Sequence, residues 1–202
     1  MYKKSSVTEI PTVTITPVPE EKIAQNLKIK YDSKSNQKRL ERKVGSRVIQ
    51  KVTGPKTKVT FKSSDTKVAK VGKTSGVITC VGVGRAVITA KAEESQQYKA
   101  ASKRITIYVI PKDVGIKSLK SNKKGQATLK CGNGAEGCTY QIEYTCNGKT
   151  KKVTLKGKRG AARTFKKLKS GKKFKARIRA YKKAGGTVYY GKYSKWKSCK
   201  IK

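Results

Sequence analysis

The sequence predicts an all-β chain of two tandem antiparallel β-sandwiches behind an extended N-terminal tether. Short runs of strand-forming residues recur at roughly ten-residue spacing, with Gly, Ser and Asp between them. No segment holds a helical period beyond one turn, whereas Phe174–Tyr181 alternates strictly between apolar and polar positions. The 202 residues suffice for two domains of about 100 residues each. The predicted division is a tether at 1–24, a first domain at 25–111 and a second at 112–202.

The tether is rich in Thr and Pro, a composition that favours extended, polyproline-like conformations and cannot build a core. We interpret it as a linker. The one exception that the pattern allows is a short strand at Val13–Thr16 added to a sheet edge.

The first domain contains seven strand-like runs separated by turn residues. They are Leu27–Lys30, Ser46–Val52, Lys58–Lys62, Lys67–Val71, Val77–Val81, Arg85–Lys91 and Lys103–Ile110. Residues Ser33–Lys43 are polar and basic, and no strand is predicted there.

Three segments of this domain, Val59–Val71, Gly76–Thr79 and Gly82–Ala90, resemble the bacterial immunoglobulin-like domains of group 2. The tail Tyr98–Ile107 fits the variant of that family with a long last connection. Such domains recur in surface proteins of Gram-positive bacteria, so the resemblance implies a β-sandwich with a spacer or adhesive role.

Residues Pro111–Gly115 are predicted to form a short hinge between the domains. The runs beyond it are Gly115–Leu119, Ala127–Cys131, Tyr140–Tyr144, Lys151–Leu155, Ala162–Leu168, Phe174–Tyr181 and a last strand from Thr187 to the terminus. Ala184-Gly185-Gly186 is a hairpin turn between the final two strands.

Three segments of this half, Tyr140–Tyr144, Ala176–Tyr181 and Tyr189–Trp196, resemble the third strand, the sixth strand and the approach to the last strand of a fibronectin type III domain. The resemblance is to the Lys-rich kind found in bacterial surface proteins. The chain departs from the family pattern at two positions. Phe174 stands where the tyrosine-corner Tyr is expected, and Cys131 stands where a core Trp is usual. The only Trp, Trp196, is expected to point inward and to supply compensating bulk.

The residue types argue against catalysis and against a metal or cofactor. The sequence has no His, which removes the commonest general base and the usual zinc ligand. The Cys spacings match no zinc motif, and the 11 acids are scattered. No run approaches the ~20 apolar residues of a membrane span, and no signal peptide is visible. We therefore expect a non-enzyme that is a piece of an extracellular or cell-surface protein.

The five cysteines leave one pairing open. Cys131 ends one predicted strand and Cys138 precedes the next, so a disulfide between them competes with the favoured reading of two buried, reduced thiols. Cys80, Cys146 and Cys199 are expected to be free.

The charge is the chain's outlier, because 51 Lys and Arg face 11 Asp and Glu, a formal net charge of +40. Residues 112–202 concentrate it, with 28 basic side chains against three acids. A polyanion-binding surface is predicted on one outer sheet face, and Glu143 is expected to face outward there. Its residues are Lys173, Lys175, Arg177, Arg179, Lys195 and Lys197. A solvated face that keeps the protein soluble explains the same charges.

The charge is predicted to spread along strands rather than to gather around aromatic residues. Only Tyr189, Tyr190 and Tyr193 are candidates for exposed rings, so no specific nucleic-acid binding is expected. The predicted function is a non-catalytic spacer or adhesion module, monomeric, with cell-wall or host polysaccharide or protein as its partner. The alternatives are a module that binds teichoic acid, glycosaminoglycan or nucleic acid by charge, and an accessory region of a larger extracellular enzyme.

Overall fold

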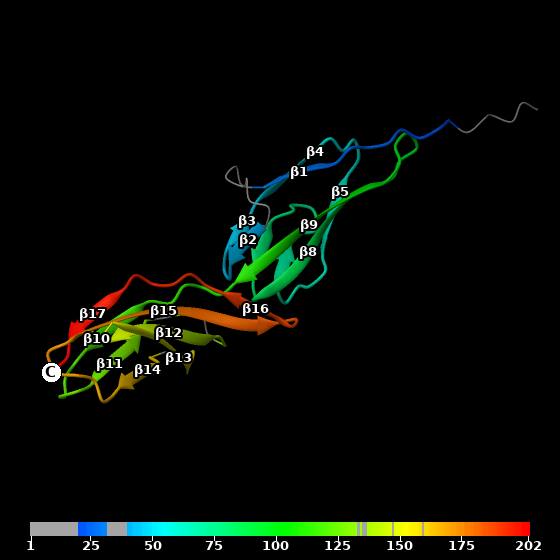
Figure 1. Cartoon of the computed structure of the whole chain (residues 1–202). Helices are drawn as coiled ribbons and strands as arrows, with labels where there is room; N and C mark the ends of the chain where they lie inside the picture. Colours follow the sequence, from blue (N-terminus) through cyan, green and yellow to red (C-terminus); the bar gives the residue numbers. More distant parts are fainter. Residues whose placement is uncertain (1–19, 32–39, 133, 135–136, 147, 159) are drawn as a thin grey trace, which may run out of the picture.

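The computed structural model describes residues 20–31, 40–132, 134, 137–146, 148–158 and 160–202. Seventeen strands and no helix are found in these residues, arranged as two sandwiches placed end to end (Figure 1). Across the same residues, none forms a helix long and apolar enough to cross a membrane. Most of the predicted tether, with the allowed strand at Val13–Thr16, lies outside the described residues.

The first sandwich contains nine strands. They are β1 (Lys28–Tyr31), β2 (Leu40–Lys43), β3 (Arg47–Val48), β4 (Gln50–Thr53), β5 (Val59–Ser63), β6 (Ala69–Val71), β7 (Ile78–Cys80), β8 (Gly84–Ala92) and β9 (Ala101–Ile110). One sheet has the order β2-β9-β8-β5, a second β3-β7-β6, and β1 pairs with β4 alone. Alternation builds this core: Ala86, Ile88 and Ala90 of β8 are buried, whereas Arg85 and Lys91 are exposed.

Two features of this sandwich differ from the prediction. Strand β2 forms inside the polar stretch and pairs in parallel with β9, yet only Leu40 is buried, so the strand carries no period-two signal. The run Ser46–Val52 is divided at Ile49, which is 70% exposed. The chain changes sheets there, because β3 pairs with β7 and β4 with β1.

The second sandwich contains eight strands. They are β10 (Ile116–Lys120), β11 (Ala127–Cys131), β12 (Thr139–Cys146), β13 (Lys149–Lys156), β14 (Ala162–Phe165), β15 (Lys173–Ala184), β16 (Thr187–Tyr190) and β17 (Lys197–Lys200). One sheet has the order β10-β11-β14, and the facing sheet β13-β12-β15-β16, with β17 also pairing with β15. The β15–β16 turn holds Gly185 and Gly186 at φ values of 52° and 76°, as a two-residue hairpin turn requires.

Phe174, at the position of the tyrosine corner, is part of the apolar core of this sandwich. Phe174 is fully buried, and its ring centroid lies 5.0 Å from that of Phe165 and 5.5 Å from that of Tyr144. Cys131 is buried in the same cluster. Packing therefore holds the region around Phe174, since Phe has no hydroxyl to bond the backbone.

The inward position predicted for Trp196 is wrong, because this side chain is 41% exposed. The predicted last strand is divided into β16 and β17, and the register of β17 sets the side on which Trp196 lies. Lys197 lies opposite Ala176, which is buried, so Trp196, one residue earlier, falls on the outer face of the sheet.

The two sandwiches share apolar contacts at their junction. Val83 and Ile110 of the first sandwich belong to the same buried cluster as Val114 and the core of the second. Lys43 and Asp113 form an ion pair across the junction. The predicted hinge is thus part of a packed contact, in which Val114 is buried.

Candidate functional site: the basic face of the second sandwich

The predicted binding residues of β15 lie on the outer face of the β13-β12-β15-β16 sheet, which we call the basic face. Alternation along β15 buries Phe174, Ala176 and Ile178 and leaves Lys175, Arg177 and Arg179 on this outer side. Across the sheet, Arg177 is opposite Glu143 and Arg179 is opposite Gln141. Strand pairing therefore fixes which polar group each guanidinium meets.

Aromatic rings alternate with these cations in a stacked column along β15. Arg177 lies 4.7 Å from the centroid of Trp196 and 4.3 Å from that of Tyr193. Arg179 lies 4.4 Å from Tyr193 and 3.9 Å from Tyr190. The order of the column is Lys175, Trp196, Arg177, Tyr193, Arg179, Tyr190. The prediction that charge avoids aromatics is therefore wrong for this face.

Polar partners lie beneath the column. Arg177 donates from Nε and Nη2 to Oε1 of Glu143, at 2.9 and 2.6 Å. Oε1 of Gln141 accepts from Nε of Arg179 at 2.9 Å and from the Tyr193 hydroxyl at 2.8 Å. The Glu143 side chain is only 9% exposed. It points outward as predicted, but the column covers it.

The segment between β16 and β17 brings the rings over the sheet. Ser194 bonds the backbone of Ile178 in both directions: its N–H donates to the Ile178 carbonyl at 2.7 Å, and its Oγ accepts from the Ile178 N–H at 3.1 Å. The Gly191 N–H donates to the Ala180 carbonyl. These bonds anchor the segment at both ends of Tyr193, and burial raises the pKa of that Tyr.

The six predicted residues do not all meet on this face. Lys175, Arg177 and Arg179 share the column, and exposed Lys173 continues the outer row of β15. Lys195 is exposed in the segment between β16 and β17. Lys197 points the other way, and its Nζ donates to the Lys117 carbonyl of β10 at 3.1 Å. The missed member is Trp196, which was expected in the core. Tyr190 and Tyr193 were predicted as candidates for exposed rings but not as partners of the arginines, and the Tyr-x-x-Trp spacing of 193 and 196 was the available signal.

The column limits what the basic face can do. Both ring faces of Tyr193 are occupied by guanidinium groups, and Trp196 lies between Arg177 and Lys175. Tyr193, held between two guanidinium groups, is no free platform for a base or a sugar, whereas Tyr190 and Trp196 are 42% and 41% exposed. The main role of the column is therefore to hold the segment between β16 and β17 on the sheet.

The five cysteines are free thiols in the structure. Burial raises the pKa of Cys131 to about 11, and burial also raises those of Cys80, Cys138 and Cys199. The disulfide between Cys131 and Cys138 stays a prediction that thiol titration can decide. Among the described residues, no group of three or more Cys, Asp or Glu is placed to hold a metal ion.

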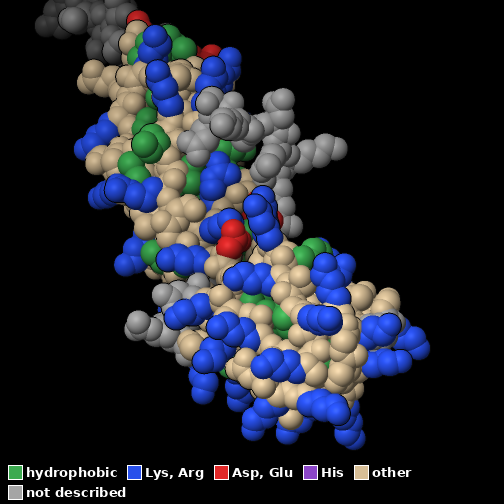
Figure 2. Space-filling view, turned by 90° about the vertical axis from the view of Figure 1, so that its left-hand side faces the viewer, with side chains coloured by type: hydrophobic (Ala, Val, Ile, Leu, Met, Phe, Trp, Pro, Cys, Tyr) green, Lys and Arg blue, Asp and Glu red, His purple; other side chains and the backbone are tan. Residues whose placement is uncertain are grey.

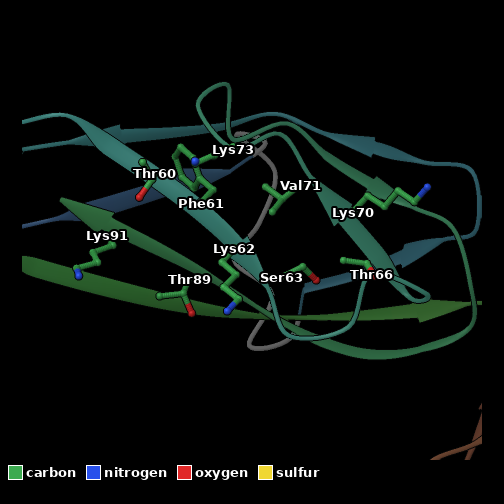
Figure 3. A pocket seen from close by; sticks show the side chains of 10 residues that line it. All are labelled: Thr60, Phe61, Lys62, Ser63, Thr66, Lys70, Val71, Lys73, Thr89 and Lys91. Atoms are coloured by element: carbon green, nitrogen blue, oxygen red, sulfur yellow. The ribbon is translucent and has the colours of Figure 1, made fainter. Parts of the chain in front are cut away.

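Positive charge also covers the rest of the molecule. Figure 2 shows Lys and Arg side chains over both sandwiches, with acids at few places on the visible face. A hollow of about 750 Å³ lies in the first sandwich beside β5, β6 and β8. Figure 3 shows Phe61 and Val71 in it, with Lys62, Lys70, Lys73 and Lys91 around them. Its lining combines two apolar side chains with lysines and hydroxyl residues.

Comparisons with known proteins bear on the fold. No family model matches the sequence, and no curated protein matches it. A two-domain fibronectin type III segment from chicken tenascin is similar in structure, with a TM-score of 0.58 at 16% identity, over 88% of this chain and 98% of that one. The chicken CNTN1 FN1–FN3 domains give a TM-score of 0.37 at 13% identity, over 89% and 67% of the two chains. The fold inference rests on the tenascin segment: the chain is a tandem β-sandwich similar to fibronectin type III domains.

Proposed function

We propose that this chain is a non-catalytic spacer or adhesion module of a secreted or cell-surface protein, in which the two sandwiches form one stiff unit. The observation that carries the proposal is the shared cluster at the junction. Val83 and Ile110 are packed in one cluster with residues of the second sandwich, and they are only 8% and 5% exposed. Burying such side chains contributes about 1.5–3 kcal/mol each, enough to favour one relative orientation over free rotation.

The finer parts of the proposal rest on the sequence. The resemblance of Val59–Ala90 to group 2 bacterial immunoglobulin-like domains supports a bacterial surface origin. The change of sheets after Ile110 supports domains at 25–111 and 112–202. The tandem fold similar to the tenascin segment supports an extracellular setting.

Small-angle X-ray scattering on wild type and Val83→Asp tests the stiff unit. We expect one rigid conformation to fit the wild-type curve, and Val83→Asp to require an ensemble because it places a charge in the junction. Ile49→Asp, at a 70% exposed position between β3 and β4, serves as the control and should behave as wild type. A wild-type curve that already needs an ensemble would remove the support for a spacer of fixed length.

The net charge of +40 favours a second candidate function, electrostatic binding of polyanions. Heparin chromatography tests it. A polyanion-binding module should be retained beyond ~0.5 M NaCl with a steep salt dependence, because each contact releases counterions. Elution at low salt would leave the spacer function alone.

A further inference from the structure

A second basic site lies at the end of the second sandwich that is remote from the junction. There a hollow of about 460 Å³ opens between the two sheets. Lys149, Lys151, Lys166 and Lys167 surround it, and Tyr144 and Cys146 lie deeper. We call it the end hollow.

The four lysines come from opposite sheets. Lys149 and Lys151 lie opposite Cys146 and Tyr144 in the β12–β13 register, and they share the side of β13 that carries Val153 and Leu155. They therefore extend the core side of the sheet past the end of the core. Lys166 and Lys167 follow β14 of the facing sheet. Two pairs of lysines, one pair from each sheet, thus line the opening.

No acid balances these charges among the described residues that line the hollow. The two described acids of the second sandwich are engaged elsewhere: Asp113 with Lys43 at the junction, and Glu143 with Arg177 and Lys152 beneath the column. Converging cations repel one another unless an anion lies between them. The end hollow therefore has a positive potential that favours an anion.

The backbone at Lys167 provides a second, independent observation. Its φ of 58° is the only positive φ of a non-glycine residue in the described part of the chain. A long side chain in the left-handed region is strained, and such strain concentrates at binding and catalytic sites. Glycine would relieve this strain but would remove the ammonium group from the opening.

We propose that the end hollow binds a phosphate or sulfate group of an acidic polysaccharide. Lysine ammonium groups suit a tetrahedral oxyanion as point charges. The ring of Tyr144 is packed against Phe165, with 4.7 Å between the ring centroids, and against Phe174. Sites for single-stranded nucleic acid combine cations with rings that stack on bases, whereas contacts with sulfate or phosphate oxygens need only the ammonium groups. The lining therefore suits the oxyanions of an acidic polysaccharide. The proposal rests on the polyanion-binding function and gives it a location away from the column.

The test uses three probes on the full chain: a heparin tetrasaccharide, a glycerol phosphate oligomer and a single-stranded thymidine oligomer. Affinity is measured by calorimetry. Occupancy is measured as protection of Cys146 from iodoacetamide, with half-exposed Cys199, outside the hollow, as the internal reference. We expect one of the two oxyanion oligomers to bind and to protect Cys146 selectively; which one binds identifies the source of the oxyanion.

Two variants of equal net charge locate the site. In the first variant, four lysines of the end hollow are changed to Gln: Lys149, Lys151, Lys166 and Lys167. In the control variant, four lysines around the hollow of the first sandwich are changed to Gln: Lys62, Lys70, Lys73 and Lys91. We expect the first variant to lose at least about tenfold in affinity and all Cys146 protection, and the control to keep both. Equal weakening of the two variants would overturn the end hollow while leaving polyanion binding intact. If heparin does not retain the wild-type chain, both the polyanion-binding function and the assignment of the end hollow are overturned.

Lys167→Gly separates binding from folding. We expect it to raise the urea midpoint, because it relieves the strained φ, and to weaken oligomer binding at the same time. A lower midpoint, or unchanged affinity, would overturn the role given to Lys167. Tighter binding of the thymidine oligomer than of either other probe would overturn the assignment to polysaccharide.

Discussion

Replacing Glu143 by Gln tests whether the column is held from beneath by one buried charge. The substitution keeps the side-chain shape and one acceptor oxygen but removes the negative charge from a carboxylate that is 9% exposed. Arg177 would then lose its ion pair while remaining beside the other cations of the column, and Lys152, 3.7 Å away, would lose its own.

The expected loss of stability is about 2 kcal/mol. A hydrogen bond to a charged group contributes roughly 1.5–3 kcal/mol, and Arg177 makes two such bonds to a single oxygen. Its side chain is 32% exposed, so water screens the guanidinium and places the value in the lower half of that range. A loss of this size shifts the urea midpoint by about 1 M when m is near 2 kcal/mol per M.

Urea denaturation followed by circular dichroism provides the assay, since urea leaves the ionic strength unchanged. Glu94→Gln is the matched control, because the ion pair of Glu94 with Lys22 is exposed and its loss should leave the midpoint unchanged. Added NaCl should reduce the effect of Glu143→Gln without abolishing it, since buried pairs are weakly screened. Equal midpoints for the two variants would refute the claim that Glu143 holds the column.

Three further predictions concern Trp196 and the thiols. Trp196 is the only Trp and is 41% exposed, so acrylamide should quench its fluorescence in the native state. Resistance to quenching would show that Trp196 is buried in the core. The native pKa of Cys131, about 11 against an ordinary 9.0, means that unfolding releases its proton between these values, so stability should fall as pH rises from about 9 to 11. Cys131→Val should reduce this slope, and an identical pH profile would contradict the assignment. Thiol titration in urea without reductant should find five thiols; three would show that two cysteines are bridged, and peptide mapping would then test whether they are Cys131 and Cys138.

Sequence patterns predict this fold where each strand carries its own periodicity. The alternation of β15 predicts both its core side and its charged side, because Phe174, Ala176 and Ile178 leave only one orientation. Strand β2 lacks such a pattern: only its first residue is buried, and pairing with β9 defines it. Local sequence cannot predict a strand whose support comes from a neighbour 67 residues away in the chain, as in the pair Leu40 and Ile107.

Only the part of the candidate site that lies on a strand with its own periodicity was predicted from the sequence. Arg177 and Arg179 were placed on the correct face by period two alone. The positions of Trp196 and Lys197 depend on where β17 resumes after the segment anchored by Ser194, and a shift of one residue exchanges the two faces. The inward position of Trp196 was expected from the missing core Trp rather than from periodicity. Counting in twos from buried Tyr189 places Trp196 on the outer face, where the register of β17 also puts it.

The distribution of partners changes how the charge of the second sandwich should be understood. Its guanidiniums at 177 and 179 are stacked, hydrogen-bonded and half-buried, so they stabilise the sheet more than they attract a ligand. The lysines around the end hollow are exposed and have no acid among the described lining residues. Free, hydrated ammonium groups are the ones that exchange counterions for a polyanion. Binding capacity should therefore follow the unpaired lysines rather than the densest row of positive residues in the sequence.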